Sequence, residues 1–345
     1  MKIENDLKLD FSQVLIRPKR STINSRSDVN LNRTMKFKWS PKTWEGVPIL
    51  AANMDTIGTF EIYDVLSKHK IITAFHKFYE PEDYKDFVDN RESVDPNFFA
   101  ISTGIGEKSI EKLEQINKIV EFNIICIDIA NGYISSLVEF CSSVREKFPE
   151  CIIIAGNVVT REVVEELILN GKVDIVKVGI GPGSACTTRL KTGVGMPQLS
   201  AIIECADAAH GVSGQIIGDG GITCPGDMAK AFGGGADFVM VGGVFAGHIQ
   251  NPGEIIVENG KEFKIFYGMS SKHAMEKHFG KMNSYRSSEG RHVKIPFKGD
   301  LNDTVLDYLG GLRSTCTYIN APSIKEVSKC TTFVQVARQL NTIYA

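Results

Sequence analysis

Residues 179–197 form a glycine-rich segment that carries the side chains best suited to covalent chemistry. Its five glycines let the backbone adopt positive φ and approach a ligand closely. Two interpretations compete for Cys186: a small buried hydrophobe, or a nucleophilic thiol. A polar loop is a poor place to bury a side chain, and Thr187 and Thr188 follow the cysteine directly. The pattern therefore favours a reactive thiol.

Two further glycine pairs, Gly220–Gly221 and Gly242–Gly243, follow apolar runs. Backbone N–H groups without a Cβ in the way suit an anion, and barrels commonly bind phosphate after their last two strands. Asp219, directly before the first pair, is placed to accept two hydrogen bonds from a ribose diol. Ordinary turns explain one glycine pair, but two pairs predict a phosphorylated, ribose-bearing substrate.

Charged candidates follow other predicted strands or lie in a flap. In the segment YRSSEG (285–290), Arg286 is a candidate partner for a phosphate or base carbonyl, and Glu289 for acid–base work. The alternative is that both are solvated flap charges. Lys77 follows one predicted strand and Asp128 lies at the end of another, so both belong to the same end of the fold. No Cys/His cluster has the spacing of a transition-metal site.

The elements that position these residues recur at a nearly constant interval. Short runs rich in β-branched residues alternate with segments of helical periodicity. Nearly continuous apolar strands covered by helices are typical of a parallel sheet, and eight of them predict an α/β fold, a closed (β/α)8 TIM barrel. The predicted strands span residues 47–52, 71–75, 98–103, 124–129, 151–156, 174–179, 215–220 and 237–242.

Two insertions break this regular spacing: the loop at 179–197 after the sixth strand and a flap at 261–300 after the eighth. Both leave the C-terminal ends of strands, where barrel enzymes carry their chemistry. Residues 1–45 lack strong periodicity, and we expect them to wrap the barrel floor or a neighbouring subunit. A closing helix is expected to begin near Asp303. With no linker or low-complexity tract, residues 1–345 are predicted to form a single domain.

Composition excludes several classes of protein. The 345 residues are 43% hydrophobic and 23% charged, which excludes global disorder. The net charge of −2 gives no reason to expect a nucleic-acid partner. No apolar run approaches the ~18 residues of a membrane span, and the charged N-terminus has no signal-peptide core. Eight scattered cysteines are typical of free thiols, so a cytoplasmic location is expected.

Several of these segments together resemble the IMP dehydrogenase/GMP reductase family of (β/α)8 barrels. The resemblance covers essentially the whole chain and includes the loops. The order Tyr285-Arg286 in the flap, and the short passage from 76–79 to the third strand, favour the reductase branch over the dehydrogenase branch. The matching segments include VGIGPGSACTTR, TGVG, DGGI, FVMVGGVFAG, FYGMSS, AANMDT, DIANGY, AGNVVT, ECADAAHG, YRSSEG and GGLRSTCTY.

That branch implies the reaction of GMP with NADPH to give IMP, ammonia and NADP⁺, a step of purine nucleotide metabolism and salvage. The Cys186 thiolate would add to purine C2, ammonia would leave, and hydride would then reach the thioimidate. The departing ammonia needs a general acid, and the family implies Thr188 working with Glu289.

The resemblance also implies which residues hold each ligand. GMP or IMP would contact Ser184, Asp219, Gly220, Gly221, Gly242, Gly243, Gly268, Met269, Ser270, Arg286, Ser287, Ser288, Glu289 and Gly290. NADPH would contact Ser25, Arg26, Lys77, Asp128, Ile129, Ala130, Ile180, Gly181, Met269, Tyr285, Arg286, Ser314, Thr315, Cys316 and Thr317. A monovalent cation, usually K⁺, would lie against Gly181, Gly183, Cys186 and Arg189.

The family draws Ser25 and Arg26 from a neighbouring subunit, which implies a homo-oligomer, with a homotetramer as the expected assembly. Two other functions stay open at this point. One is the dehydrogenase reaction, NAD-dependent oxidation of IMP to XMP. The other is a non-catalytic purine-nucleotide sensor that uses the same phosphate loops, against which the intact Cys-Thr-Thr segment argues.

Overall fold

Eight parallel strands close into a barrel in the computed structural model, which describes residues 3–280 and 287–337. Each predicted run overlaps one strand, and consecutive strands are neighbours, so the predicted (β/α)8 barrel is confirmed. The circle closes where β11 pairs with β4. The barrel strands are β4 (Ile49–Ala51), β5 (Ile72–Phe75), β6 (Phe99–Thr103), β7 (Ile124–Asp128), β8 (Ile152–Val158), β9 (Ile175–Val178), β10 (Gln215–Asp219) and β11 (Phe238–Val241).

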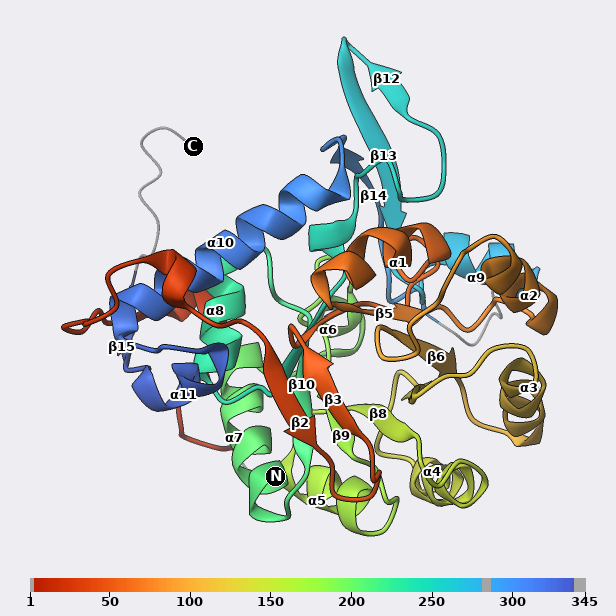
Figure 1. The fold of residues 1–345 in the computed structure, drawn as a ribbon, viewed down its shortest axis with the longest axis horizontal. Helices are drawn as coiled ribbons and strands as arrows, with labels where there is room; N and C mark the ends of the chain where they lie inside the picture. The colour runs from red at the N-terminus through yellow and green to blue at the C-terminus, as the bar shows by residue number, and fades with distance from the viewer. Residues whose placement is uncertain (1–2, 281–286, 338–345) are drawn as a thin grey trace.

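Helices surround this barrel (Figure 1). Every residue of β5, β6 and β9 is buried, because helices cover the outer face and side chains fill the interior. Among the helices that the structure describes, none has the length and apolar character that a membrane crossing requires. The helices around the barrel are α1 (Phe60–Leu66), α2 (Pro81–Asp89), α3 (Glu107–Asn117), α4 (Ser135–Lys147), α5 (Arg161–Leu169), α7 (Gln198–Gly211), α8 (Pro225–Gly233) and α10 (Leu301–Ile319).

The N-terminal residues are more regular than the sequence predicted. The strands β2 (Arg33–Lys36) and β3 (Thr43–Gly46) form an antiparallel hairpin. Its Trp44 is buried, packs on Phe238 at 5.1 Å between ring centroids, and donates from Nε1 to the carbonyl of Asn97. Because β11 begins at Phe238 and β6 begins two residues after Asn97, the hairpin covers the barrel floor.

A second small sheet joins the two ends of the chain. The strand β1 (Val14–Ile16) pairs antiparallel with β15 (Phe333–Gln335). Residues separated by most of the sequence supply the two strands, so the local periodicity of the N-terminal segment could not reveal the pairing. A short helix, α11 (Val327–Cys330), lies just before β15.

Both insertions at the other end of the barrel contain regular structure. The flap is a three-stranded antiparallel sheet of β12 (Ile256–Glu258), β13 (Lys261–Tyr267) and β14 (His292–Pro296), which projects from the barrel (Figure 1). It therefore begins before residue 261. The helix α9 (Lys272–Phe279) lies between β13 and β14, and α6 (Thr188–Thr192) lies within the loop after β9.

A buried ion pair ties the floor to the barrel wall. Asp174, fully buried, accepts from Arg145 Nη2 at 2.5 Å and from three backbone N–H groups at 2.9 to 3.1 Å. Two of those N–H groups belong to Trp39 and Ser40, between the strands of the floor hairpin. The carboxylate thus connects α4, β8, β9 and the N-terminal hairpin.

We predict that Asp174→Asn lowers the free energy of unfolding by about 3 to 5 kcal/mol, because the Arg145 guanidinium stays buried without its counter-charge. Urea unfolding at pH 7 measures the change. The matched control is Asp207→Asn, which breaks the exposed Arg161–Asp207 pair and should cost less than about 1 kcal/mol. Equal losses in the two variants would contradict the role of Asp174.

Candidate active site

The predicted nucleophile and the predicted acid are brought together by backbone pairing between two distant segments. Cys186 and Gly290 form an antiparallel bridge. The N–H of Thr187 donates to the carbonyl of Glu289 at 2.8 Å, and the N–H of Arg291 donates to the carbonyl of Ala185 at 2.9 Å. The loop after β9 and the return strand of the flap therefore have a fixed register.

Two glycines allow a third segment to approach this pairing. A Cβ at Gly290 would lie 2.8 Å from the backbone nitrogen of Ser271 and 3.0 Å from the Cα of Gly268. A Cβ at Gly268 would lie 2.9 Å from the carbonyl oxygen of Ala185. Because real side chains do not fit at such distances, the close packing of these three segments requires glycine at both positions.

A chain of side-chain hydrogen bonds runs across the paired segments. Cys186 Sγ donates to Thr188 Oγ1 at 3.2 Å, and Thr188 Oγ1 donates to Glu289 Oε2 at 2.7 Å. All three side chains are partly buried and partly accessible. The structure thus brings together the three residues that the sequence analysis grouped as catalytic. We call this chain the Cys–Thr–Glu relay.

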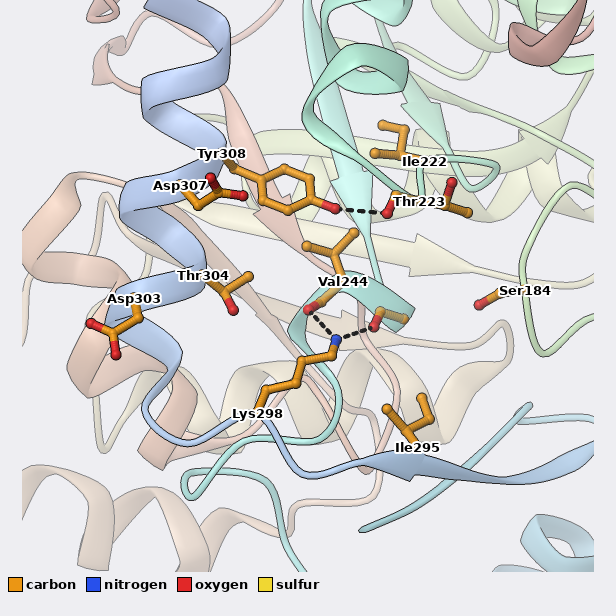
Figure 2. A pocket seen from close by; sticks show the side chains of 11 residues that line it. Ser184, Ile222, Thr223, Val244, Ile295, Lys298, Asp303, Thr304, Asp307 and Tyr308 are labelled. Atoms are coloured by element: carbon orange, nitrogen blue, oxygen red, sulfur yellow. Dashed lines mark hydrogen bonds between the residues drawn. The ribbon is translucent and has the colours of Figure 1, made fainter. Parts of the chain in front are cut away.

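A cavity of about 590 Å³ lies against the same loop and is lined by Ser184, two residues before Cys186, and by Gly243 (Figure 2). A Cβ at Gly243 would lie 2.6 Å from Ser184 Oγ, so glycine brings this backbone against the loop after β9. Within the described residues, neither Ser184 Oγ nor the N–H groups of Gly221 and Gly243 hydrogen-bond to a protein acceptor. Unpartnered donors around a cavity fit an anion.

The remaining lining residues come from α10, the flap and the loops after β10 and β11. They are Ile222, Thr223, Val244, Ile295, Lys298, Asp303, Thr304, Asp307 and Tyr308. None of these residues was predicted from the sequence to belong to the site. Figure 2 shows α10 as one wall of the cavity, with Tyr308 donating to the carbonyl of Thr223 at 2.9 Å.

A buried lysine, also missed in the sequence, organises the barrel mouth. Lys177 Nζ lies 2.6 Å from Asp128 Oδ1 and 3.5 Å from Asp219 Oδ2. Burial alone would lower the pKa of Lys177, but the two carboxylates outweigh it and hold this pKa above its ordinary value. Burial alone would raise the pKa of Asp128, but Lys177 lowers it. Asn157 also donates to Asp219 Oδ2, at 2.7 Å.

A second missed residue, Asp55, anchors the helix of the flap. Its buried Oδ2 accepts from Tyr267 Oη at 2.7 Å and Lys277 Nζ at 2.9 Å, and lies 2.7 Å from His278 Nε2. Burial alone would raise the pKa of Asp55, but the bonds from Lys277, Tyr267 and His278 lower it. The backbone N–H of Asp55 donates to Met269 Sδ at 3.5 Å, so the same residue also contacts the predicted ligand loop.

The residues expected to hold the dinucleotide fall into two groups. Lys77 follows β5, Asp128 is the last residue of β7, and Lys77 helps to lower the pKa of Asp128. Ser25 and Arg26 lie at the 3-10 helix η2 (Arg26–Asp28), which contacts α10, the helix that carries residues 314–317. Figure 1 shows the C-terminal end of α10 on the opposite side of the molecule from α9.

The remaining described residues that were predicted to contact ligands lie in the loops at the ends of the barrel strands and in the flap. The carbonyl of Ser270 accepts from the N–H of Glu289 at 3.2 Å, and Ser288 Oγ accepts from the N–H of Lys272 at 3.1 Å. Tyr285 and Arg286 lie outside the described residues. Ile129 and Ala130 follow β7, Ile180 and Gly181 follow β9, Gly220 and Gly221 follow β10, Gly242 follows β11, and Ser287 is exposed.

The backbone expected to bind a monovalent cation has free oxygen atoms. Hydrogen bonds from described residues leave the carbonyls of Gly181 and Cys186 without a donor, and the Gly183 carbonyl accepts one bond, from the N–H of Cys186 at 3.0 Å. Carbonyl oxygens are ligands that hard cations prefer. Arg189 lies alongside, bonded to Asp10 Oδ2 at 3.1 Å and to the carbonyl of Met196 at 2.5 Å.

The fold and the position of the site define the class: a (β/α)8-barrel enzyme whose candidate active site lies at the C-terminal ends of its strands. The IMP dehydrogenase / GMP reductase domain matches residues 8–341. This chain belongs to that family.

Relatives with established names align over nearly their whole length. GMP reductase 1 of Homo sapiens is 56% identical over 345 residues, which cover 100% of this chain and 99% of the human protein. GMP reductase 2 of Bos taurus is 56% identical over 347 residues, covering 99% and 98%. GMP reductase of Shewanella pealeana is 56% identical over 345 residues, covering 100% and 99%.

A buried histidine beside Lys77 gives a prediction about stability and pH. His76 is 8% exposed, stacks on Tyr79 at 3.9 Å between ring centroids, and accepts at Nδ1 from the N–H of Phe78. Burial lowers the pKa of His76 to about 4. Between pH 6.5 and 4 the unfolded chain therefore binds a proton that the folded chain does not, and acidification destabilises the fold.

We predict that His76 contributes up to about 1.4 kcal/mol per pH unit to the loss of stability below pH 6.5. His76→Gln keeps an acceptor for the Phe78 N–H but cannot titrate, so its unfolding free energy should fall less steeply from pH 6.5 to 5. Urea unfolding across that range tests this. His248, whose pKa burial also lowers to about 4, stays unchanged in the variant, so a residual slope is expected. Identical slopes for both proteins would exclude the assignment.

Proposed function

We propose that this protein catalyses the NADPH-dependent reductive deamination of GMP to IMP and ammonia. The observation that carries the proposal is the Cys–Thr–Glu relay, a thiol connected by hydrogen bonds to a carboxylate beside a cavity of unpartnered donors. The GMP reductase names of its relatives support the same reaction.

Covalent catalysis is the first role of the relay. Purine C2 of GMP carries an amino group and is a poor hydride acceptor until that group leaves. The Cys186 thiolate adds to C2, which splits one difficult step into two easier ones. The thiol proton passes to Thr188 Oγ1, whose own proton moves to Glu289 Oε2 along the two observed hydrogen bonds.

Release of ammonia is the second role. The leaving amine needs a proton, and Glu289, protonated through the relay, returns it. A Cys186 thioimidate of the purine then remains. A reduced nicotinamide, when bound, supplies the hydride that C2 accepts as the sulfur departs. In this sequence of proton transfers, Glu289 donates the proton to the leaving amine. Thr188 passes the thiol proton from Cys186 to Glu289.

Substrate binding is assigned to the backbone around the cavity. The phosphate of GMP lies against Ser184 and the N–H groups of Gly221 and Gly243, which have no protein acceptor within the described residues. Asp219, held by Asn157 and Lys177, presents its other oxygen to the ribose. The loop at 268–270 and residues 286–290 complete the purine site.

Cofactor binding is assigned to both groups of predicted residues. Lys77 follows β5 and Asp128 ends β7, whereas residues 314–317 lie in the C-terminal part of α10, which η2 contacts. In Figure 1 the C-terminal end of α10 lies on the opposite side of the molecule from α9. One dinucleotide therefore meets both groups only where a neighbouring copy supplies the second, which supports a homo-oligomer. Lys77 and the neighbour's Arg26 suit a 2′-phosphate, which favours NADPH.

The free carbonyls of Gly181 and Cys186, with that of Gly183, are assigned to a monovalent cation such as K⁺. A cation held there would fix the backbone on both sides of the nucleophile. A cytoplasmic setting is also proposed, since the chain holds eight free cysteines and no disulfide among its described residues.

Product analysis tests the reaction itself. We expect GMP with NADPH to yield IMP and ammonia, with consumption of NADPH measured at 340 nm and the nucleotides separated by chromatography. IMP with NAD⁺ is the second arm. Accumulation of XMP there would replace the proposal with the dehydrogenase reaction, and no product in either arm would favour a nucleotide sensor.

Substitution of the nucleophile tests the covalent step. Cys186→Ala should bind GMP within a few-fold of the parent affinity. It should show no turnover, because the variant has no thiolate to add to purine C2. Intact-mass spectrometry of acid-quenched reactions should detect a purine adduct in the parent protein alone. Cys224→Ala, which removes an exposed thiol outside the relay, is the matched control and should retain full activity. Substantial NADPH oxidation by Cys186→Ala would exclude the thioimidate.

Substitution of the acid tests the relay. We predict that Glu289→Gln lowers kcat by about 10²- to 10⁴-fold, the usual contribution of general acid–base catalysis. The amide still accepts the hydrogen bond from Thr188 but cannot carry the proton. Rapid-quench measurement of ammonia release checks this step separately from hydride transfer. An unchanged kcat would assign the acid role to another group.

A further inference from the structure

Lys298 stands out among the residues that line the cavity beside the relay. The cavity wall carries two carboxylates, Asp303 and Asp307, and among its described lining residues Lys298 is the only cation. Phosphate carries up to two negative charges, so a wall with two carboxylates opposes its entry unless a cation offsets them. In Figure 2, Lys298 reaches toward the loop after β11, with α10 along one side of the cavity.

The ammonium group of Lys298 contacts the backbone that faces the phosphate. Its Nζ donates to the carbonyls of Gly243 and Val244, at 3.4 and 3.2 Å. In a trans peptide the C=O and the following N–H point in opposite directions. The Gly243 carbonyl shares its peptide unit with the N–H of Val244, which has no protein acceptor among the described residues, so a positive charge on that carbonyl strengthens the attraction of the Val244 N–H for an anion. The Val244 carbonyl belongs to the peptide unit of the Phe245 N–H, which already donates to the carbonyl of Gly242 at 3.0 Å.

The backbone holds Lys298 in this position. Its N–H donates to the carbonyl of Gly247 at 2.8 Å, and the N–H of Ile249 donates to the carbonyl of Gly299 at 2.9 Å. These two bonds join the segment after β14 to the loop after β11 on both sides of the lysine. A charge that is placed before the ligand arrives costs little ordering entropy on binding.

Lys298 also lacks a counter-ion in the protein. No described carboxylate lies within ion-pair distance of its ammonium, although Asp303 and Asp307 line the same cavity. Partial burial lowers the pKa of Lys298, and no carboxylate offsets that effect. By contrast, Lys294, on β14, is paired with Glu258. A cation without a carboxylate partner beside unpartnered N–H groups is suited to an anionic ligand.

We propose that Lys298 is a positioning residue of the phosphate subsite, which supplies its positive charge through the peptide unit that joins Gly243 to Val244. The inference rests on the proposed function for the identity of the nucleotide, GMP, but not for the recognition of its phosphate. Lys298 makes no contact with the relay, so it contributes to binding and not to the chemical steps.

The test compares ligands with and without a phosphate. We expect Lys298→Met to raise the KM for GMP about tenfold, with kcat within about twofold, since loss of uniform binding raises KM alone. Guanosine, which lacks the phosphate, should inhibit the parent and the variant equally. Lys298→Arg keeps the charge and should restore the KM to within a few-fold. Lys294→Met removes one charge from the same flap and should leave both ligands unaffected.

Isothermal titration with GMP and guanosine gives the same comparison without turnover. If the parent protein fails to convert GMP, the proposed reaction is wrong, while the titration still decides the role of Lys298. An unchanged affinity for GMP in Lys298→Met would overturn the proposal. Equal weakening of GMP and guanosine would overturn it as well, because it would mark a general structural role. Thermal unfolding of each variant confirms that the fold is retained.

Discussion

The pairing of Cys186 with Gly290 is the constraint on which the candidate active site depends. A thiol on one loop and a carboxylate on another are useful together only if their separation is fixed to within a fraction of an ångström. Backbone hydrogen bonds on both sides of the bridge fix it, and the side chains then need only the short reach through Thr188. The two glycines at 268 and 290 allow the ligand loop to lie against the same pairing.

Charge at the barrel mouth is organised around one buried ammonium. Lys177 is 2% exposed and lies between Asp128 and Asp219, so it neutralises carboxylates on two different strand ends. Burying an ion is costly unless it is paired, and here each partner is also assigned to a ligand, the dinucleotide or the ribose. The arrangement lowers the pKa of Asp128 and orients both carboxylates before either ligand binds. It also links the cofactor side of the mouth to the substrate side.

The sequence predicted the features that depend on local pattern. The eight barrel strands are continuous apolar runs, and both the relay and the glycine pairs lie in short segments whose composition is unusual for a loop. It did not reveal contacts made over long distances. Lys177 is a charged residue within an apolar predicted strand. A lysine in such a run indicates a buried charge that needs a carboxylate partner, and this was the one signal that the sequence offered. Asp55 gave no local signal, because its partners Lys277 and His278 lie more than two hundred residues away. The floor hairpin was missed for a related reason, since its burial depends on Trp44 meeting the start of distant strands.

The return segment of the flap connects chemistry with binding. Glu289 lies at its start, β14 follows, and Lys298 lies just beyond the strand, against the loop after β11. An extended strand is stiff along its length, and both of its ends are bonded to barrel loops, one at Thr187 and the other at Gly247. In the proposed reaction, a nucleotide with its base at Cys186 and its phosphate at Gly243 meets loops that are bonded to the two ends of this segment. Binding energy from the phosphate, remote from the reacting carbon, would then serve to align the base with Glu289, which is how enzymes convert remote contacts into rate.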